Sequence, residues 1–275
     1  MCIRDSSYAS VVETLPLSSR LQRIVLHVDE PSVLDTAHAG DSTVGVYFGT
    51  DGCVHPESGC RSYSIRRRDG AHITIDVMLH THGPGTRWAS TAAPGDRVGL
   101  DHARSWYRPS AGTEWQLLVS DLSGMPAAAR ILEELPEDTV AILLIEIAAD
   151  EDLGYLPQRS GVTVIPRVGT GNGYAPSTLA SSVQNLDLPT GRGYCWFAGE
   201  AAESRAVRKC VRSLGWTIDQ YDITGYWRRD SEAWDVRFAR AQHEILPIYQ
   251  RALAEGKGDK LAFEEFDEAC ERIGL

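Results

Sequence analysis

The sequence predicts two domains of different class, an antiparallel Greek-key β-barrel followed by a parallel-sheet α/β domain, with a C-terminal helical extension. Three observations predict this order. Short β-branched segments separated by turn signals fill residues 1–111, strand and helix patterns alternate over 112–230, and apolar residues recur at helical spacing in 231–275. A chain of 275 residues is long for one domain and sufficient for these parts.

The barrel is indicated by segments rich in β-branched residues. In residues 72–79, apolar and polar side chains alternate, which is typical of a strand with one buried face. The strands expected are residues 21–28, 43–48 and 72–79, and the turn signals are Asp51-Gly52, Asp69-Gly70 and Pro94-Gly95-Asp96.

The α/β domain begins after the linker-like segment Pro109–Gly112. Residues 140–147 form a nearly continuous apolar run, as expected for a strand that is buried on both faces. The strands expected are 115–119, 140–147, 162–165, 194–198 and 216–221, and the helices are 126–135, 177–186 and 200–214. Two terminal helices, 231–255 and 261–273, are expected to pack on the body or on another subunit.

Composition excludes several classes of partner. With 27 basic and 38 acidic residues the net charge is −11, which argues against nucleic acid and anionic membranes as main partners. No apolar run approaches the roughly 20 residues that span a bilayer, and the first residues lack the apolar region of a secretory signal. We therefore expect a cytoplasmic protein.

Cysteines and histidines give no clear metal or redox motif. The six cysteines contain no CxxC, so idle reduced thiols are expected, with a functional Cys53–Cys60 pair as the minor alternative. His80 and His82 offer two nitrogen ligands without a third nearby, and no metal site is predicted.

The segment Arg61-Ser62-Tyr63-Ser64 offers a cation, an aromatic face and hydroxyls at alternating strand positions. An arginine can bind a phosphate with two parallel hydrogen bonds, a tyrosine ring can stack on a flat heterocycle, and a serine can bond a ring nitrogen. The tetrapeptide alone favours a simpler interpretation, an ordinary strand with Tyr63 in the core and Arg61 in water.

Residues 80–88 read as a Gly-Pro-Gly turn that enters a helix. Gly83 and Gly85 allow close backbone approach and Thr86 is expected to cap the helix, whose positive end favours an anion. The alternative is a surface turn with Trp88 as a core anchor.

Two loops mark candidate nucleotide contacts in the α/β domain. Asp121 and Ser123 follow a strand and open a helix, the place where nucleotides bind in such sheets, although no GxGxxG is present. Glu200 lies at another strand-to-helix junction, where the helix dipole is a sufficient structural reason for an acid.

These motifs occur in one order along the chain. They are Arg61–Ser64, Asp76–His80, Gly83–Ala89, Pro94–Asp96, Asp121–Ala127, Gly199–Ala201 and Gly225–Arg228. Taken together, residues from about Tyr8 to Asp230 resemble the siderophore-interacting protein family of FAD-dependent ferric-siderophore reductases, in the ferredoxin-NADP reductase-like superfamily.

The resemblance implies roles for individual residues. Arg61 would hold the FAD pyrophosphate, Tyr63 would stack on the isoalloxazine, and Ser64 would bond near flavin N5. The full set of implied FAD contacts is Arg61, Ser62, Tyr63, Ser64, His80, Gly83, Gly85, Thr86 and Trp88. The implied contacts on the nicotinamide side are Asp121, Ser123 and Glu200.

The function implied is a cytoplasmic flavoenzyme that passes electrons from NAD(P)H, with NADPH favoured, through FAD to an Fe(III) siderophore. No side-chain acid or base is required for this electron transfer, and Arg66, Arg67 or Arg68 would attract the anionic ferric complex. Two alternatives remain open. A non-catalytic siderophore- or flavin-binding module is kept open by Leu122, which stands where the family usually has an acid, and a general flavin reductase or electron-transfer protein is the other.

Overall fold

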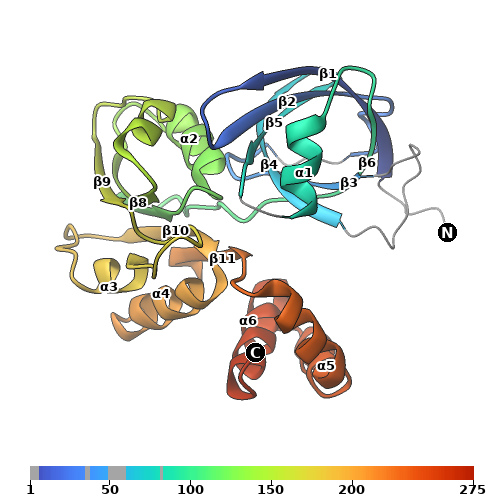
Figure 1. Ribbon diagram of the computed structural model, residues 1–275. Coiled ribbons are helices and arrows are strands. Elements are labelled where there is room, and N and C mark those ends of the chain that lie inside the picture. The colour runs from blue at the N-terminus through green and yellow to red at the C-terminus, as the bar shows by residue number, and fades with distance from the viewer. Residues whose placement is uncertain (1–5, 35–37, 49–59, 81–82) are drawn as a thin grey trace. The chain divides into compact units, whose positions relative to one another are not determined.

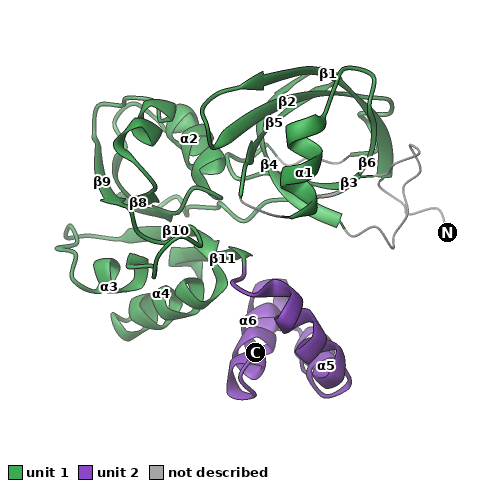
Figure 2. Ribbon diagram, viewed as in Figure 1, with its two compact units in different colours: residues 1–227 green, residues 228–275 purple. Residues whose placement is uncertain are grey.

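The computed structural model describes residues 6–34, 38–48, 60–80 and 83–275. Contacts divide the chain into two compact units, residues 1–227 and 228–275 (Figure 2). The predicted division between residues 111 and 112 lies within the first unit, and the predicted domain limits remain predictions. The turn at Asp51-Gly52, the thiol of Cys53 and His82 lie outside the described residues, whereas Cys60 is a free thiol.

The first part of unit 1 is a closed antiparallel barrel with strand order β1-β2-β5-β4-β3-β6 (Figure 1), which confirms the predicted fold class. One short helix, α1, lies between β5 and β6 in the chain. The elements are β1 (Ser6–Pro16), β2 (Leu21–Val28), β3 (Thr43–Phe48), β4 (Cys60–Asp69), β5 (His72–Met78), α1 (Pro84–Thr91) and β6 (Arg97–Arg104).

Two barrel strands, β1 and β6, were not predicted from the sequence. In β1 the inward positions carry small or polar side chains such as Ser7 and Ala9, so hydrophobic alternation is weak. In β6 the inward side chains of Val98 and Leu100 are followed by the buried carboxylate Asp101. Both strands are established by pairing with each other and with β2 and β3, which is a tertiary effect.

The second part of unit 1 is a parallel sheet in the order β11-β10-β7-β8-β9. Helix α2 contributes to the apolar cluster on one side of the sheet, and α3 and α4 to a separate cluster on the other. The elements are β7 (Trp115–Ser120), α2 (Met125–Glu134), β8 (Val140–Ile147), η2 (Asp150–Tyr155), β9 (Val162–Val168), α3 (Leu179–Gln184), β10 (Gly193–Glu200), α4 (Ala201–Ser213), η3 (Ile218–Gln220) and β11 (Tyr221–Trp227).

The last strand of the sheet was predicted at the wrong place. Residues 218–220 form a 3-10 turn, and the strand begins only at Tyr221. The Thr217 backbone N–H and hydroxyl both bond the Gln220 side chain, which closes the turn locally. The strand therefore contains the Gly225-Tyr226-Trp227 segment and carries it to the edge of the sheet near β10.

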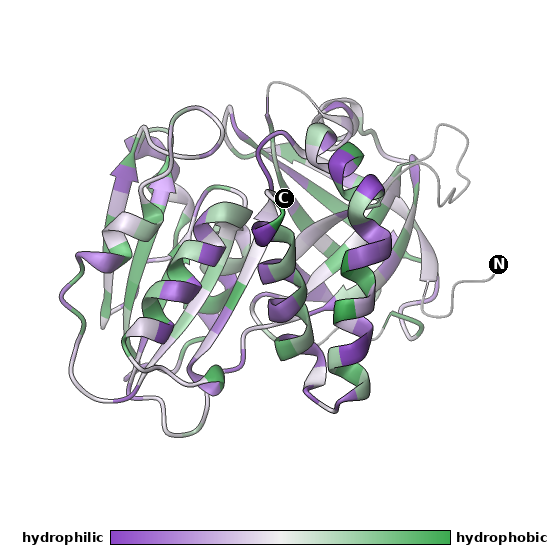
Figure 3. Ribbon diagram, turned by 90° about the horizontal axis from the view of Figure 1, so that it is seen from below, coloured by the Kyte–Doolittle hydropathy of each residue, from purple (hydrophilic) through white to green (hydrophobic). Residues whose placement is uncertain are grey.

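Unit 2 is a pair of helices, α5 (Ser231–Ala254) and α6 (Gly258–Arg272), that share an apolar cluster. The rings of Trp234 and Phe238 stack with centroids 4.8 Å apart. Figure 3 shows hydrophobic and hydrophilic residues alternating along both helices, as in amphipathic helices. Among the described residues, no helix combines the length and apolar character that a membrane crossing requires.

Candidate cofactor and nucleotide site

Strand β4 carries the Arg61–Ser64 segment, with β3 on one side and β5 on the other. The Arg61 side chain is exposed, and its Nη1 donates to the carbonyl oxygen of Cys60 at 3.0 Å. Among the described residues no carboxylate forms an ion pair with Arg61. Its guanidinium therefore remains available for an anion.

Tyr63 is half-buried and packs against the apolar core of the barrel. Its ring centroid lies 6.2 Å from that of Phe48 and 6.4 Å from that of Trp88, and Phe48 and Trp88 stack at 4.6 Å. Burial raises the pKa of the Tyr63 hydroxyl, so the group stays protonated. These contacts agree with the core-anchor interpretation of Trp88, and the flavin contacts of both rings remain predictions.

Helix α1 begins next to Tyr63, because Gly85 in its first turn lies against the Tyr63 hydroxyl. Its N-cap is Gly83, at φ 122°, and in the part of the chain that the structure describes no side chain caps the helix. The expectation that Thr86 caps the helix is wrong, because Thr86 lies within the first turn and its Oγ1 accepts from the His80 backbone N–H at 3.0 Å. The uncapped first turn leaves backbone donors and positive charge for an anion.

Gly85 has a packing reason to be glycine. A Cβ at this position would overlap the Tyr63 hydroxyl. With a side chain at residue 85, the Tyr63 hydroxyl would have to move away from the helix. His80 lies at the surface beside this turn, and crowding by neighbouring protein atoms lowers the pKa of its imidazole.

Ser64 provides the test of whether these residues fit a flavin. Its side chain is buried, with 6% of the residue exposed, and its Oγ has no hydrogen-bond partner in the described part of the chain. A buried hydroxyl without a partner is unfavourable unless a ligand or water completes its bonding. An open guanidinium, an uncapped helix start and an orphaned hydroxyl on neighbouring elements fit the phosphates and polar ring edge of FAD.

The nucleotide candidates meet at the point where the sheet order reverses. Strand β7 has β8 on one side and β10 on the other, and the helices that follow β7 and β10 pack on opposite faces of the sheet. The loops after β7 and β10 therefore lie at the position where nucleotides bind in such sheets, which we call the crevice. Residues Ser120 and Ala198 are register partners there. The sequence prediction that placed Asp121, Ser123 and Glu200 together is consistent with this topology.

Asp121 is buried and fully bonded within this crevice. Its Oδ1 accepts from the Ser123 backbone N–H at 2.8 Å and from the Ser123 hydroxyl at 2.5 Å. Its Oδ2 accepts from Trp227 Nε1 at 2.5 Å. Burial raises the pKa of Asp121, and these donors oppose the rise.

Glu200 is the N-cap of α4, where its side chain accepts from the backbone N–H groups of Ala202 and Glu203. This confirms the structural reason that the sequence offered for an acid there. A nicotinamide contact of Glu200 remains a prediction.

Two aromatic residues of this region were given no role by sequence reasoning. Trp227 bonds Asp121, and Tyr226 brings a buried hydroxyl to the junction with the barrel. The available signal was their position in the Gly225–Arg228 segment, one of the ordered motifs.

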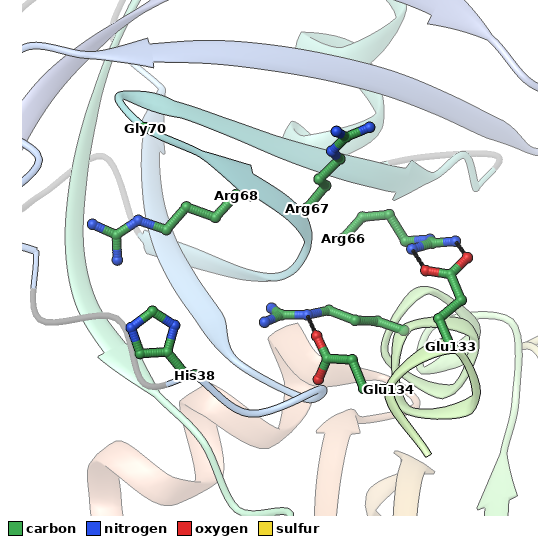
Figure 4. Close-up of a pocket in the computed structure, with 8 residues that line it drawn as sticks. His38, Arg66, Arg67, Arg68, Gly70, Glu133 and Glu134 are labelled. Atoms are coloured by element: carbon green, nitrogen blue, oxygen red, sulfur yellow. Dashed lines mark hydrogen bonds and ion pairs between the residues drawn. The ribbon is translucent and has the colours of Figure 1, made fainter. Parts of the chain in front are cut away.

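Arg66, Arg67 and Arg68 line one cavity of about 640 Å³, together with Arg130 of α2 and His38 (Figure 4). These arginines differ in whether a carboxylate pairs with them.

Arg66 binds both carboxylate oxygens of Glu133, at 2.6 and 2.5 Å, and its guanidinium lies 5.7 Å from the centre of the Tyr155 ring. Arg130 bonds Glu134 at 2.7 Å and the Ile65 carbonyl at 2.9 Å. Arg67 is exposed, and within the described ranges Arg68 makes only a long 3.4 Å hydrogen bond, to the Pro31 carbonyl oxygen.

Comparison with known families agrees with this geometry. A family model described as "Siderophore-interacting FAD-binding domain" matches residues 53–104, and one described as "Siderophore-interacting protein" matches residues 113–230. This chain belongs to the siderophore-interacting protein family. The first match includes the Arg61–Ser64 segment and α1, and the second includes the crevice.

Curated relatives are distant and longer than the aligned part. The uncharacterized protein Rv2895c of Mycobacterium tuberculosis is 29% identical, over 62% of this chain and 65% of the relative. The ferric vibriobactin reductase ViuB of Vibrio cholerae is 27% identical, over 62% of this chain and 64% of its own length. The NADPH-dependent ferric-chelate reductase of Escherichia coli is 25% identical, over 64% and 70%. The match thus spans just under two thirds of the first two relatives.

Solved structures extend the likeness to the fold. A siderophore utilization protein from T. fusca is 28% identical, with a TM-score of 0.70 over 82% of this chain and 93% of its own. A ferredoxin NADP+ reductase from Neisseria gonorrhoeae, with bound FAD and NADP, is 14% identical and has a TM-score of 0.59 over 81% and 99%. The second comparison concerns the fold alone.

Proposed function

We propose that this protein is a cytoplasmic ferric-siderophore reductase that uses FAD and takes its electrons from NAD(P)H, with NADPH favoured. Membership of the family supports siderophore and FAD chemistry, and the names of the Vibrio and Escherichia relatives support reduction of chelated iron. The name of the Escherichia relative also favours NADPH as the donor.

The orphaned Ser64 hydroxyl is the observation that carries the proposal. It lies on the same strand as the open guanidinium of Arg61 and the half-buried Tyr63 ring. Arg61 and the first turn of α1 would hold the phosphates of FAD, Tyr63 would support the ring, and Ser64 would bond its edge. His80, Ser62 and Trp88 would complete the surroundings. When bound, FAD supplies the chemistry that accepts a hydride and releases single electrons.

At the crevice, Asp121 would act by organising the loop rather than by touching the nicotinamide with a free carboxylate. Its oxygens already accept three hydrogen bonds, which orient Ser123 and Trp227. Ser123 and the start of α4 at Glu200 would then receive the nicotinamide nucleotide. This division of roles is supported by the topology of the switch point.

The iron substrate would be attracted by Arg67 and Arg68. Fe(III) chelates with hard oxygen ligands are commonly anionic, and Fe(II) binds such ligands weakly, so reduction releases the metal. Arg66 and Arg130 are neutralised by Glu133 and Glu134. The net positive charge of the cavity therefore comes mainly from Arg67 and Arg68.

The visible spectrum of the purified protein, with and without added FAD, tests the proposal first. We expect flavin absorbance, bleaching by anaerobic NADPH, and reoxidation by ferric chelates with Fe(II) captured by a colorimetric chelator. A protein that takes up no FAD would overturn the proposal. Flavin that is bleached but never reoxidised by any ferric chelate would favour the general flavin reductase, and chelate binding without bleaching would favour the binding module.

Charge reversal in the cavity tests the substrate contacts. The double variant Arg67→Glu/Arg68→Glu should raise KM for an anionic ferric chelate about tenfold or more, because both attractive charges become repulsive. Its FAD affinity should be unchanged. The matched control, Lys209→Glu/Arg212→Glu in the last turns of α4, alters the net charge equally. An equal rise in KM in the control would mean that only the overall charge matters.

A further inference from the structure

A second buried hydroxyl lies beside Ser64, and no proposed role uses it. Tyr226 of β11 packs against the apolar cluster of the parallel sheet and lies near Trp106, in the segment that joins the barrel to the sheet. Its hydroxyl oxygen is buried and has no hydrogen-bond partner in the described part of the chain. Ser64 and Tyr226 come from strands far apart in the sequence and from different parts of unit 1. Two orphaned hydroxyls at one place are unusual, because buried polar groups are nearly always bonded.

The two hydroxyls are neighbours without being bonded to each other in normal geometry. Ser64 lies near enough to oppose the rise in the pKa of Tyr226. In the described part of the chain, however, neither oxygen has a hydrogen-bond partner. A small movement of either side chain, such as a χ1 rotation of Ser64, would allow the pair to form.

The surroundings keep Tyr226 protonated and in place. Burial and the nearby Asp41 carboxylate raise the pKa of the Tyr226 hydroxyl. The Tyr226 ring lies 6.4 Å from that of Trp106, centroid to centroid.

Asp41 is itself immobilised. It is 0% exposed and accepts from the Ser105 hydroxyl, the backbone N–H groups of Trp106 and Tyr107, and Trp196 Nε1. Burial and Asp41 therefore keep the Tyr226 phenol neutral, and its hydroxyl can donate one hydrogen bond and accept another.

We propose that Tyr226 is a positioning residue of the flavin site: its O–H donates to Ser64 Oγ and thereby directs the Ser64 O–H toward the polar edge of bound FAD. This inference rests on the proposed function. It follows from the donors and acceptors of the two hydroxyls. When the Tyr226 O–H donates to Ser64 Oγ, the Ser64 proton is still free to be donated to a ligand. A residue of β11 would then influence the midpoint potential of a flavin that the barrel binds.

A double-mutant cycle in the full-length protein tests the inference. Tyr226→Phe, Ser64→Ala and the double variant are compared for FAD affinity, visible spectrum and flavin midpoint potential against a reference dye. We expect Tyr226→Phe to change the ratio of affinities for oxidised and reduced FAD by about three- to tenfold, where tenfold corresponds to about 30 mV for a two-electron couple. In the Ser64→Ala background the same change should have no further effect.

Stability without FAD provides a second measurement. Tyr226→Phe removes an unpartnered hydroxyl, so Tm without FAD should be equal or higher, while the rise in Tm on adding FAD should shrink. The control is Tyr107→Phe, which also removes a buried hydroxyl, one that donates to Gln116 at 2.7 Å. It should leave the flavin potential unchanged.

The outcomes separate the two proposals. If the parent protein binds no FAD, the proposed function fails and this inference fails with it. If the parent binds FAD but Tyr226→Phe leaves the potential and spectrum unchanged, or shifts them equally with and without Ser64, only the role of Tyr226 is overturned.

Discussion

The barrel side and the sheet side of the proposed electron path differ in how far the protein satisfies its own polar groups. Among the described residues of the barrel side, the Arg61 guanidinium has no carboxylate partner and the buried Ser64 hydroxyl has no hydrogen-bond partner. On the sheet side, the Asp121 carboxylate accepts three hydrogen bonds and Glu200 accepts two at the start of α4.

This difference indicates which residues are available to bind a ligand and which stabilise the backbone around the site. An unpartnered buried group costs stability that a bound ligand can return, whereas a satisfied group stabilises the fold before any ligand arrives. Removal of the unpartnered groups on the barrel side should therefore weaken FAD binding and spare the folded protein. Substitutions on the sheet side should weaken the fold itself.

The largest effect is expected for Arg61→Ala. Loss of a charge-assisted bond to a phosphate is worth about 1.5–3 kcal/mol, so FAD affinity should fall about ten- to a hundredfold with Tm without FAD unchanged. Fluorescence titration of FAD measures the affinity. Arg192→Ala, which removes an exposed partner of Asp219, is the control and should bind FAD normally. Normal FAD affinity in Arg61→Ala would remove Arg61 from the site.

Asp121→Asn should have the opposite effect to Arg61→Ala: it should lower stability and leave FAD affinity nearly unchanged. Whichever way the amide lies, its NH2 faces a donor from Ser123 or Trp227, so the free energy of unfolding should fall by about 1–3 kcal/mol. Denaturant titration measures this loss, with the exposed Asp138→Asn as control. FAD affinity should stay within about twofold, while KM for NADPH rises. Unchanged stability would show that these bonds do not organise the crevice.

Gly85→Ala tests the contact between α1 and Tyr63. The added methyl would overlap the Tyr63 hydroxyl, so both Tm and FAD affinity should fall, by the roughly 1–3 kcal/mol typical of overpacking. The double variant Gly85→Ala/Tyr63→Phe removes the overlapping oxygen and should recover most of the lost stability. Failure of this rescue would mean that the glycine is needed for another reason.

The smallest effect is expected from His80 and appears as a pH dependence. Partial desolvation by neighbouring protein atoms lowers the pKa of the His80 imidazole in the folded state. In the unfolded chain the same imidazole takes up a proton near pH 6.5. Its contribution to stability is therefore complete above about pH 6.5 and is lost as the pH falls. Tm of His80→Gln should fall less than that of the parent between about pH 7 and 5. His243→Gln, on a side chain that is 73% exposed, is the control.

The sequence allowed much of the fold to be predicted, because most elements carry strong local patterns. The apolar run at residues 140–147 and the alternation in 72–79 became β8 and β5. The failures have a common cause. Strand β1 has small inward residues, and β11 follows a 3-10 turn that resembles a strand start, so neighbouring strands rather than local pattern determine both.

By itself the sequence determined the barrel, the parallel sheet, the terminal helices and the order of motifs that identify the family, because these depend on residue spacing along the chain. Only the tertiary structure decided which hydrogen-bond partners each side chain has and how deeply it is buried. It engaged Arg66 with Glu133, gave Asp121 a full set of donors, and brought the hydroxyl of Tyr226 beside that of Ser64. Hydrogen-bond satisfaction and burial depend on groups that approach from distant strands, and no local pattern records them.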